Sequence, residues 1–203
     1  MSENTPQKGT LYTFSARKML IGIGWDLARR KFVDKMAGVF AKKKFNSVLD
    51  VDLSLILCGK GGRVLDLVPQ RTCVYYENTT MYDGAIVHGG DNVAKEGEDS
   101  NESIIVDFER LPNQLGKMVV VASIKDAQAK QQHFGQSGNG YITIIDADNR
   151  QEVCHMALAS DFANMTGILA FEIVIEPKQI KIKRIGQGLP QVKSIKDLIT
   201  QYT

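Results

Sequence analysis

The sequence lacks the features that mark secreted, membrane-spanning and disulfide-rich proteins. Its 203 residues include only three cysteines, without a Cys-x-x-Cys pair, which excludes a framework of disulfides alone and argues against a cysteine zinc site. Its apolar runs are far shorter than the roughly 20 residues that span a bilayer, and no hydrophobic region follows the polar start Met1–Lys8 as in a secretory signal. We therefore expect a cytoplasmic protein in which Cys58, Cys73 and Cys154 are small core residues.

A strong charge of either sign is also missing. The chain has 25 basic and 23 acidic residues, a net charge of +2, so no general field attracts nucleic acid and no specific nucleic-acid partner is expected. Hydrophobic residues make up 43%, which is an ordinary globular balance. The length corresponds to one large domain, or to one domain with an appendage.

The usual enzyme motifs are absent. Gly22-Ile23-Gly24 lacks the third glycine of a dinucleotide-binding loop, and Gly59-Lys60-Gly61-Gly62 is not closed by the Gly-Lys-Ser/Thr of a phosphate-binding loop. Gly135-Gln136-Ser137-Gly138 resembles a nucleophile elbow, but Asn139 replaces its final glycine. The three histidines have no metal-binding spacing. The sequence therefore predicts a protein that is not an enzyme.

Short β-branched segments separated by turn residues dominate the chain, and they predict an all-β fold, a two-sheet β-sandwich with a few short helices. The ten predicted strands are Lys18–Trp25, Val48–Cys58, Arg63–Val68, Thr72–Tyr76, Ser103–Phe108, Lys117–Lys125, Gly140–Asp146, Gln151–Ala157, Ile168–Glu176 and Gln179–Ile185. Residues 18–190 are expected to form the sandwich. Residues 1–17 form a polar N-terminal segment that can add an edge strand, and residues 191–203 a short C-terminal helix.

Three segments have helical character: Ala127–His133, Ser194–Tyr202 and Arg29–Phe45. The second begins with Ser194 and has Asp197 three residues later, which is a loose capping box. The third lies in a basic insertion at about residues 28–47 and carries seven basic residues and one acidic residue. Its apolar residues share one helical stripe. They are Phe32, Val33, Met36, Ala37 and Phe40.

Acidic residues gather in two places that suit a hard cation. Asp50, Asp52 and Ser54 alternate with apolar residues, so on a strand they share one face. The segment from Asp91 to Glu102 supplies many more oxygen ligands on a glycine-containing loop, and Ca²⁺ takes six to eight oxygens in flexible geometry. From composition alone, a solvated acidic loop and a Ca²⁺ loop both remain open.

An EF-hand does not explain the acidic segment. If Asp91 is position 1, Glu102 falls at position 12, but Val93 and Lys95 occupy positions 3 and 5, where oxygen ligands are required. The glycine falls at position 7 instead of 6, and strands are expected on both sides in place of helices. We therefore reject this alternative.

Residues 18–190 resemble the TerD family of tellurite-resistance and stress proteins. The motifs that carry the resemblance are Gly22-Ile23-Gly24-Trp25-Asp26, Asp50-Val51-Asp52-Leu53-Ser54, Val87-His88-Gly89-Gly90-Asp91-Asn92, Ile124-Lys125-Asp126-Ala127 and Ile185-Gly186-Gln187-Gly188. The resemblance implies a bacterial, cytoplasmic, Ca²⁺-binding β-sandwich linked to tellurite, phage and colicin resistance. The metal ligands that it implies are Asp50, Asp52, Asp91, Asn92, Glu96, Glu98, which replaces an aspartate, Glu102 and, as a further neighbour, Asp26.

Three positions depart from the family pattern. Lys95 stands where the family has glycine, and Ser100 and Asn101 stand where it has paired aspartates. These changes remove two negative charges and add one positive charge, so we predict one firm Ca²⁺ site and a second that is weak or empty.

The sequence thus favours a non-enzymatic Ca²⁺-binding interaction module whose partners are other proteins of a stress-response complex. One alternative is a Ca²⁺-dependent module that binds membranes or other anionic surfaces through Arg29–Phe45. A third hypothesis, a metal-dependent hydrolase, requires a base near the ion, and His88 is the only candidate close in sequence.

Overall fold

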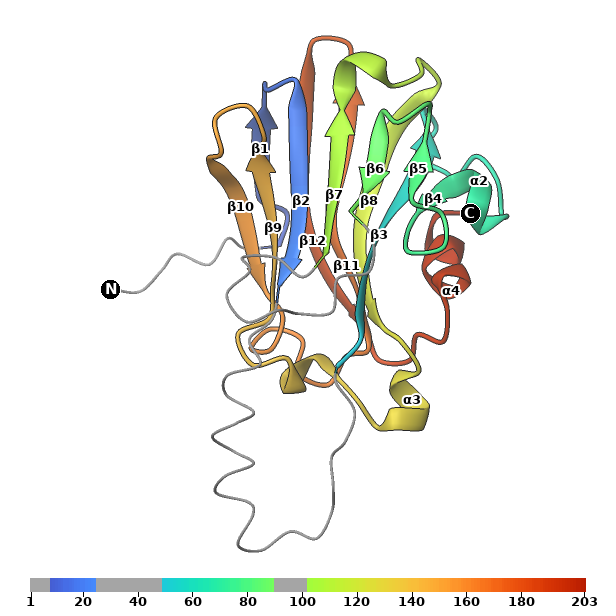
Figure 1. The fold of residues 1–203 in the computed structure, drawn as a ribbon, viewed down its shortest axis with the longest axis vertical. Coiled ribbons are helices and arrows are strands. Elements are labelled where there is room, and N and C mark those ends of the chain that lie inside the picture. The colour runs from blue at the N-terminus through green and yellow to red at the C-terminus, as the bar shows by residue number, and fades with distance from the viewer. Residues whose placement is uncertain (1–7, 25–48, 90–101) are drawn as a thin grey trace, which may run out of the picture.

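The computed structural model describes residues 8–24, 49–89 and 102–203. In these residues the chain forms two six-stranded antiparallel sheets packed face to face (Figure 1), which confirms the predicted β-sandwich. The first sheet has the order β1 (Leu11–Phe14), β12 (Gln179–Leu189), β11 (Gly167–Glu176), β8 (Leu115–Ile124), β3 (Val51–Gly59) and β4 (Cys73–Val74). The second sheet has the order β10 (Glu152–Ala157), β9 (Tyr141–Asp146), β2 (Lys18–Gly24), β7 (Glu102–Asp107), β6 (Ile86–His88) and β5 (Thr80–Met81).

The core forms because alternate residues of each strand point between the sheets. In β3, Val51, Leu53, Leu55 and Leu57 belong to the main core cluster, and all four are at most 1% exposed. Burying each such side chain stabilises the fold by about 1.5–3 kcal/mol. The side chains between them therefore face away from the second sheet.

The outer face of the first sheet is partly covered by the C-terminal residues. Ile56 and Cys58 of β3 form a second apolar cluster with Leu198 and Ile199 of α4 (Ile195–Ile199). The predicted capping box is confirmed, because Ser194 and Asp197 cap α4 reciprocally. A 3₁₀ turn, η3 (Thr200–Tyr202), completes the chain. The last residues are thus part of the packed structure.

Two predicted elements differ from the structure. In the predicted strand Arg63–Val68, only Val64 makes a bridge, to Cys58. The Asp66 carboxylate accepts a hydrogen bond from the Val68 N–H and forms a turn, and α2 (Pro69–Thr72) follows. The predicted helix Ala127–His133 is also shorter than expected. It is limited to α3 (Ala127–Lys130), because Gln131 has a φ of 53° and ends it.

The remaining helical turns are η1 (Phe108–Arg110) and η2 (Phe134–Gln136). Among the helices of residues 8–24, 49–89 and 102–203, none has the length and apolar character needed to cross a membrane. The predicted basic helix Arg29–Phe45 lies outside the described residues.

Candidate metal site

Strand β3 presents the first pair of predicted ligands. Asp52 and Ser54 alternate with core residues and therefore point away from the second sheet, as the sequence pattern predicts. Asp52 is only 7% exposed, whereas the side chain of Asp50, just before the strand, is 36% exposed. The Asp52 carboxylate is thus nearly enclosed, and the Asp50 carboxylate is open to solvent.

A lysine lies near the exposed member of this pair. The Nζ of Lys130 on α3 is 3.9 Å from Oδ2 of Asp50 and 3.7 Å from Oδ2 of Asp126. All three side chains are at least 30% exposed, so these ion pairs contribute little to stability. Asp50 and Asp126 therefore share one lysine near the start of β3.

A cleft of about 570 Å³ opens above Asp52 on the outer face of the first sheet. Its floor includes Asp52, Ser54 and Ser123. Its walls come from α2, the β4–β5 turn and the residues that lead into α4, and they carry both acidic and basic side chains. The charged wall residues are Glu77, Lys125, Asp126, Lys193 and Lys196.

The wall of this cleft has one aromatic contact with a cation. The Nζ of Lys125 lies 4.8 Å from the centre of the Tyr76 ring. Burial raises the pKa of Tyr76, and the negative charges of Glu77 and Asp52 raise it further. The tyrosine therefore stays protonated at neutral pH and can act as a hydrogen-bond donor.

Glu102 lies in a different environment from Asp52. It is the first residue of β7, it points into the sandwich and it is 2% exposed. Its Oε2 accepts a hydrogen bond of 2.6 Å from the backbone N–H of Leu53. His88, at the end of β6, places Nε2 3.1 Å from the Leu53 carbonyl oxygen and 3.5 Å from Oε2 of Glu102. The glutamate therefore meets the backbone of β3, while Asp52 faces the outer cleft.

Three of the eight predicted ligands, Asp50, Asp52 and Glu102, are in the described residues. The other five lie outside them. They are Asp26, Asp91, Asn92, Glu96 and Glu98. Within residues 8–24, 49–89 and 102–203, no group of three or more His, Cys, Asp or Glu side chains is arranged to hold a metal ion. The ligand set stays a prediction, and the described residues alone do not complete a site.

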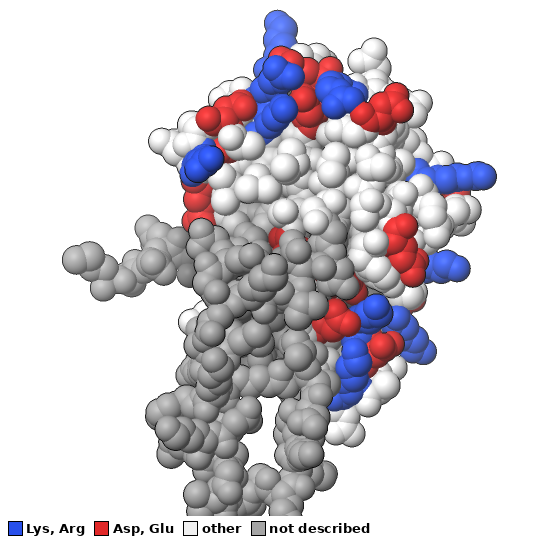
Figure 2. Space-filling view, in the orientation of Figure 1, with Lys and Arg blue, Asp and Glu red and all other residues white. Residues whose placement is uncertain are grey.

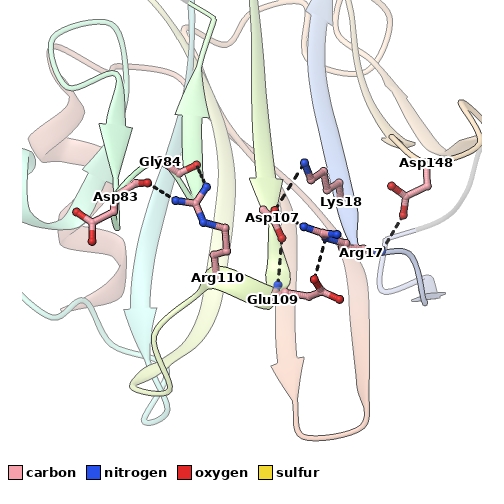
Figure 3. Close-up of polar contacts among 8 residues, drawn as sticks. All are labelled: Arg17, Lys18, Asp83, Gly84, Asp107, Glu109, Arg110 and Asp148. Carbon is pink, nitrogen blue, oxygen red and sulfur yellow. Dashed lines mark hydrogen bonds and ion pairs between the residues drawn. The ribbon is translucent and has the colours of Figure 1, made fainter.

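The opposite end of the sandwich carries an ionic cluster that the sequence did not indicate (Figure 3). Oδ2 of Asp107, at the end of β7, is 3.4 Å from Nη2 of Arg17 and 3.7 Å from Nζ of Lys18. The Nε of Arg17 lies 2.9 Å from Oε2 of Glu109, and its backbone N–H donates to Asp148. Burial alone would raise the pKa of Asp107, but these cations and the Glu109 N–H hold it below the ordinary value.

The second sheet also has an uncharged strip on its outer face. The cross-strand neighbours Val87, Ile105, Leu20 and Ile145 come from four adjacent strands, and Val87 and Ile105 are 40% and 45% exposed. Figure 2 shows little charge in the upper middle of this face, and acidic and basic side chains together at the end where β2 begins. Exposed apolar surface of this kind is typical of contact sites for other proteins.

The cysteines are free and buried, as predicted. Burial raises the pKa of Cys58 to about 11 and those of Cys73 and Cys154 to about 12. At neutral pH these thiols are protonated and are weak nucleophiles.

Sequence comparisons agree with this architecture. A family model of the TerD domain matches residues 7–202. The chain is 30% identical over 174 residues to tellurium resistance protein TerD of Serratia marcescens, a match that covers 86% of this chain and 82% of that protein. It is 27% identical over 187 residues to stress response protein SCP2 of Bacillus subtilis (strain 168), covering 91% and 89%.

Two solved structures share the fold. The crystal structure of SAV2460, a protein of unknown function, superposes with a TM-score of 0.70 at 14% identity and covers 94% of this chain and 99% of that chain. The crystal structure of SCO6318 from Streptomyces coelicolor A3(2), described as a homologue of telluride resistance protein TerD, gives a TM-score of 0.63 at 12% identity and covers 87% and 92%. At these identities the likeness concerns the fold alone.

Proposed function

This chain belongs to the TerD family, and from that membership we propose that it serves in tellurium resistance or a related stress response. We propose further that it acts in the cytoplasm as a Ca²⁺-binding interaction module and catalyses no reaction. The names of the relatives from Serratia marcescens and Bacillus subtilis support the first part. The acidic residues of the chain support the second.

One observation carries the Ca²⁺ proposal: Asp50 and Asp52 lie at the start of β3, at the end of the sandwich where the acidic segment rejoins β7. The Lys130 ammonium near Asp50 and Asp126 is further support, because these carboxylates already have a cation beside them. The donors are hard oxygens, which suit Ca²⁺. When bound, Ca²⁺ would offset the repulsion among the acids. The proposed ligands are Asp26, Asp50, Asp52, Asp91, Asn92, Glu96, Glu98 and Glu102.

The interaction role has separate support. The uncharged strip around Ile105 and Val87 offers apolar surface to a protein partner, such as another component of a stress response. The alternative role at membranes or other anionic surfaces depends on Arg29–Phe45, which lies outside the described residues. Sedimentation with anionic vesicles, with and without Ca²⁺, separates these two roles.

The position of His88 argues against it as the base that the hydrolase alternative requires. The side chain of His88 is fully buried, and its Nε2 is directed at the Leu53 carbonyl oxygen. A base in this position cannot reach a substrate in solvent. Phosphoesterase assays at high protein concentration test the remaining possibility of catalysis.

Calorimetric titration of chelator-treated protein with Ca²⁺ tests the proposal. We expect saturable binding by the parent, and binding that is greatly weakened by Asp52→Asn. Asp83→Asn is the matched control, because Asp83 is an exposed aspartate at the β5–β6 turn and its loss changes the net charge equally. The absence of any heat of binding at millimolar Ca²⁺ in the parent would reject the Ca²⁺ proposal.

A further inference from the structure

The cleft on the outer face of the first sheet has the size of a ligand site. It lies between α2 and the residues that lead into α4, two elements that lie close together beside β4 (Figure 1). Its volume of about 570 Å³ falls within the roughly 300–1,000 Å³ that is typical of sites for small organic molecules. All the residues that line it belong to the described part of the chain.

The floor of the cleft offers a hydroxyl that lacks a partner. Ser54 is only 3% exposed, and its side chain forms no hydrogen bond with another described residue. Ser123, on the neighbouring strand β8, lines the same floor. Since an enclosed hydroxyl without a hydrogen bond costs free energy, an acceptor atom of a ligand would be stabilised here.

The charged residues around the cleft differ in whether the chain already pairs them. The Glu77 carboxylate accepts a hydrogen bond of 3.1 Å from the Tyr75 hydroxyl, and the Asp126 carboxylate lies 3.7 Å from a lysine ammonium of α3. Lys193 and Lys196 are exposed and form no ion pair with a carboxylate of the described residues. The unmatched charge on the wall at α4 is therefore positive.

The wall at α2 is apolar. Leu67 and Val68, which precede this helix, are 64% and 43% exposed, and Pro69 begins it. Their segment has the composition of a strand, but apart from the bridge at Val64 it pairs with no strand of the described residues. Its apolar side chains are therefore available to cover the body of a ligand.

We propose that this cleft binds a small organic anion, a molecule with one negative group and an apolar body. The negative group lies near Lys193 and Lys196, and the apolar body covers Leu67 and Val68. A ligand with several negative charges fits less well, because Asp52 and two further carboxylates line the same cleft and would repel it. This binding requires no Ca²⁺.

Three probes that share one apolar body test the charge preference of the cleft. They are naphthylacetate, the neutral naphthylacetamide and the cationic naphthylethylamine. Magnetic resonance titration of the full chain in EDTA should show the carboxylate binding about fivefold more tightly than the amide, and the amine more weakly still. The backbone signals that move should be those of residues such as Ser54, Val68 and Ile195. Equal binding of carboxylate and amide, or no movement of these signals at millimolar probe, would overturn the proposal.

Variants of the two walls separate charge from apolar contact. Lys193→Gln with Lys196→Gln should weaken the carboxylate about tenfold and leave the amide unchanged, whereas Leu67→Ser should weaken both probes by the same factor. Lys178→Gln with Lys183→Gln is the matched control, because both lysines are exposed, lie outside the cleft and change the net charge equally. If this control weakens the carboxylate as much as the cleft variant does, the effect is one of general charge and the proposed site is wrong. Because the titrations contain EDTA, failure of the proposed Ca²⁺ binding would not alter their outcome.

Discussion

The two ends of β7 hold buried carboxylates that are stabilised in different ways. Asp107, 5% exposed, is paired with the half-exposed cations Arg17 and Lys18. Glu102, 2% exposed, receives the Leu53 N–H and faces His88 inside the sandwich. One end therefore balances its charge with side chains that solvent reaches, and the other relies on hydrogen bonds that solvent does not reach.

The difference between the two ends of β7 bears on where the Ca²⁺ proposal places an added cation. At the Asp107 end the chain supplies its own cations. At the other end the segment from Asp91 to Glu102 carries five acids and one lysine, and Asp50 and Asp52 lie at the start of β3. Lys130 is near the exposed aspartate of that pair. The proposed Ca²⁺ ion would lie at this end.

The largest expected effect is the loss of stability when the carboxylates of Glu102 and Asp107 are removed in turn. In EDTA, Glu102→Ala should lower the free energy of unfolding by about 3 kcal/mol, because it leaves the buried Leu53 N–H without its partner. Asp107→Ala should cost only about 1 kcal/mol, since Arg17 and Lys18 can turn to water. Urea denaturation measures both, and equal losses at the two ends would contradict the comparison.

The second prediction concerns the stability that the protein gains when Ca²⁺ is added. At a Ca²⁺ concentration of about 100 times the dissociation constant, the parent should gain about 2.7 kcal/mol of stability. Asp52→Asn should lose this gain and Asp83→Asn should keep it. Melting temperatures in EDTA and in millimolar Ca²⁺ provide the measurement. Identical melting temperatures of the parent in both buffers would show that the acidic end needs no ion.

The third prediction uses pH at the Asp107 end. The folded pKa of Asp107 is lowered, so its ionised form adds stability above the ordinary aspartate pKa of about 3.9, and that stability is lost as the pH falls through the folded pKa. Asp107→Asn should therefore destabilise the protein more at pH near 7 than at pH near 3. Urea titrations at the two pH values test it. An equal loss at both would mean that the charge of Asp107 is unimportant.

The smallest expected effect concerns the number of Ca²⁺ ions that each chain binds. Ser100→Asp with Asn101→Asp restores two carboxylates, and Lys95→Gly removes a cation, so the triple variant should strengthen a second, weak Ca²⁺ site. Calorimetric stoichiometry measures the change. Two equally tight ions in the parent would show that charge count does not limit binding.

The sequence predicted the sandwich because short β-branched segments are separated by turn residues, and it placed Asp52 and Ser54 on one face because they alternate with apolar residues. The boundary of one strand was one residue off. The predicted strand began at Ser103, whereas β7 begins at Glu102, and the assignment of Glu102 as a ligand, which the family resemblance implies, stays a prediction. The inward positions Ile104 and Val106 extend by the same period to Glu102, and that signal could have identified it as an interior residue.

Two other features could not be predicted from local patterns. The role of His88 depends on the edge of β3, which lies far away in sequence and is exposed only because β4 is short. The segment Arg63–Val68 has the composition of a strand but no neighbouring strand to pair with beyond the bridge at Val64. Both outcomes depend on which strands become neighbours, and that is decided by the whole chain.

The pairing of β1 with β12 has a consequence for synthesis of the protein. Leu11 lies opposite Lys183, so β1 leaves the ribosome long before its partner strand β12 has been made. Until then β1, whose Leu11 is 63% exposed even in the finished protein, presents a free strand edge to other chains. Such long-range pairing is slow and leaves nascent chains open to aggregation. A nascent chain would therefore benefit from a chaperone that holds β1 until residues 179–189 are made.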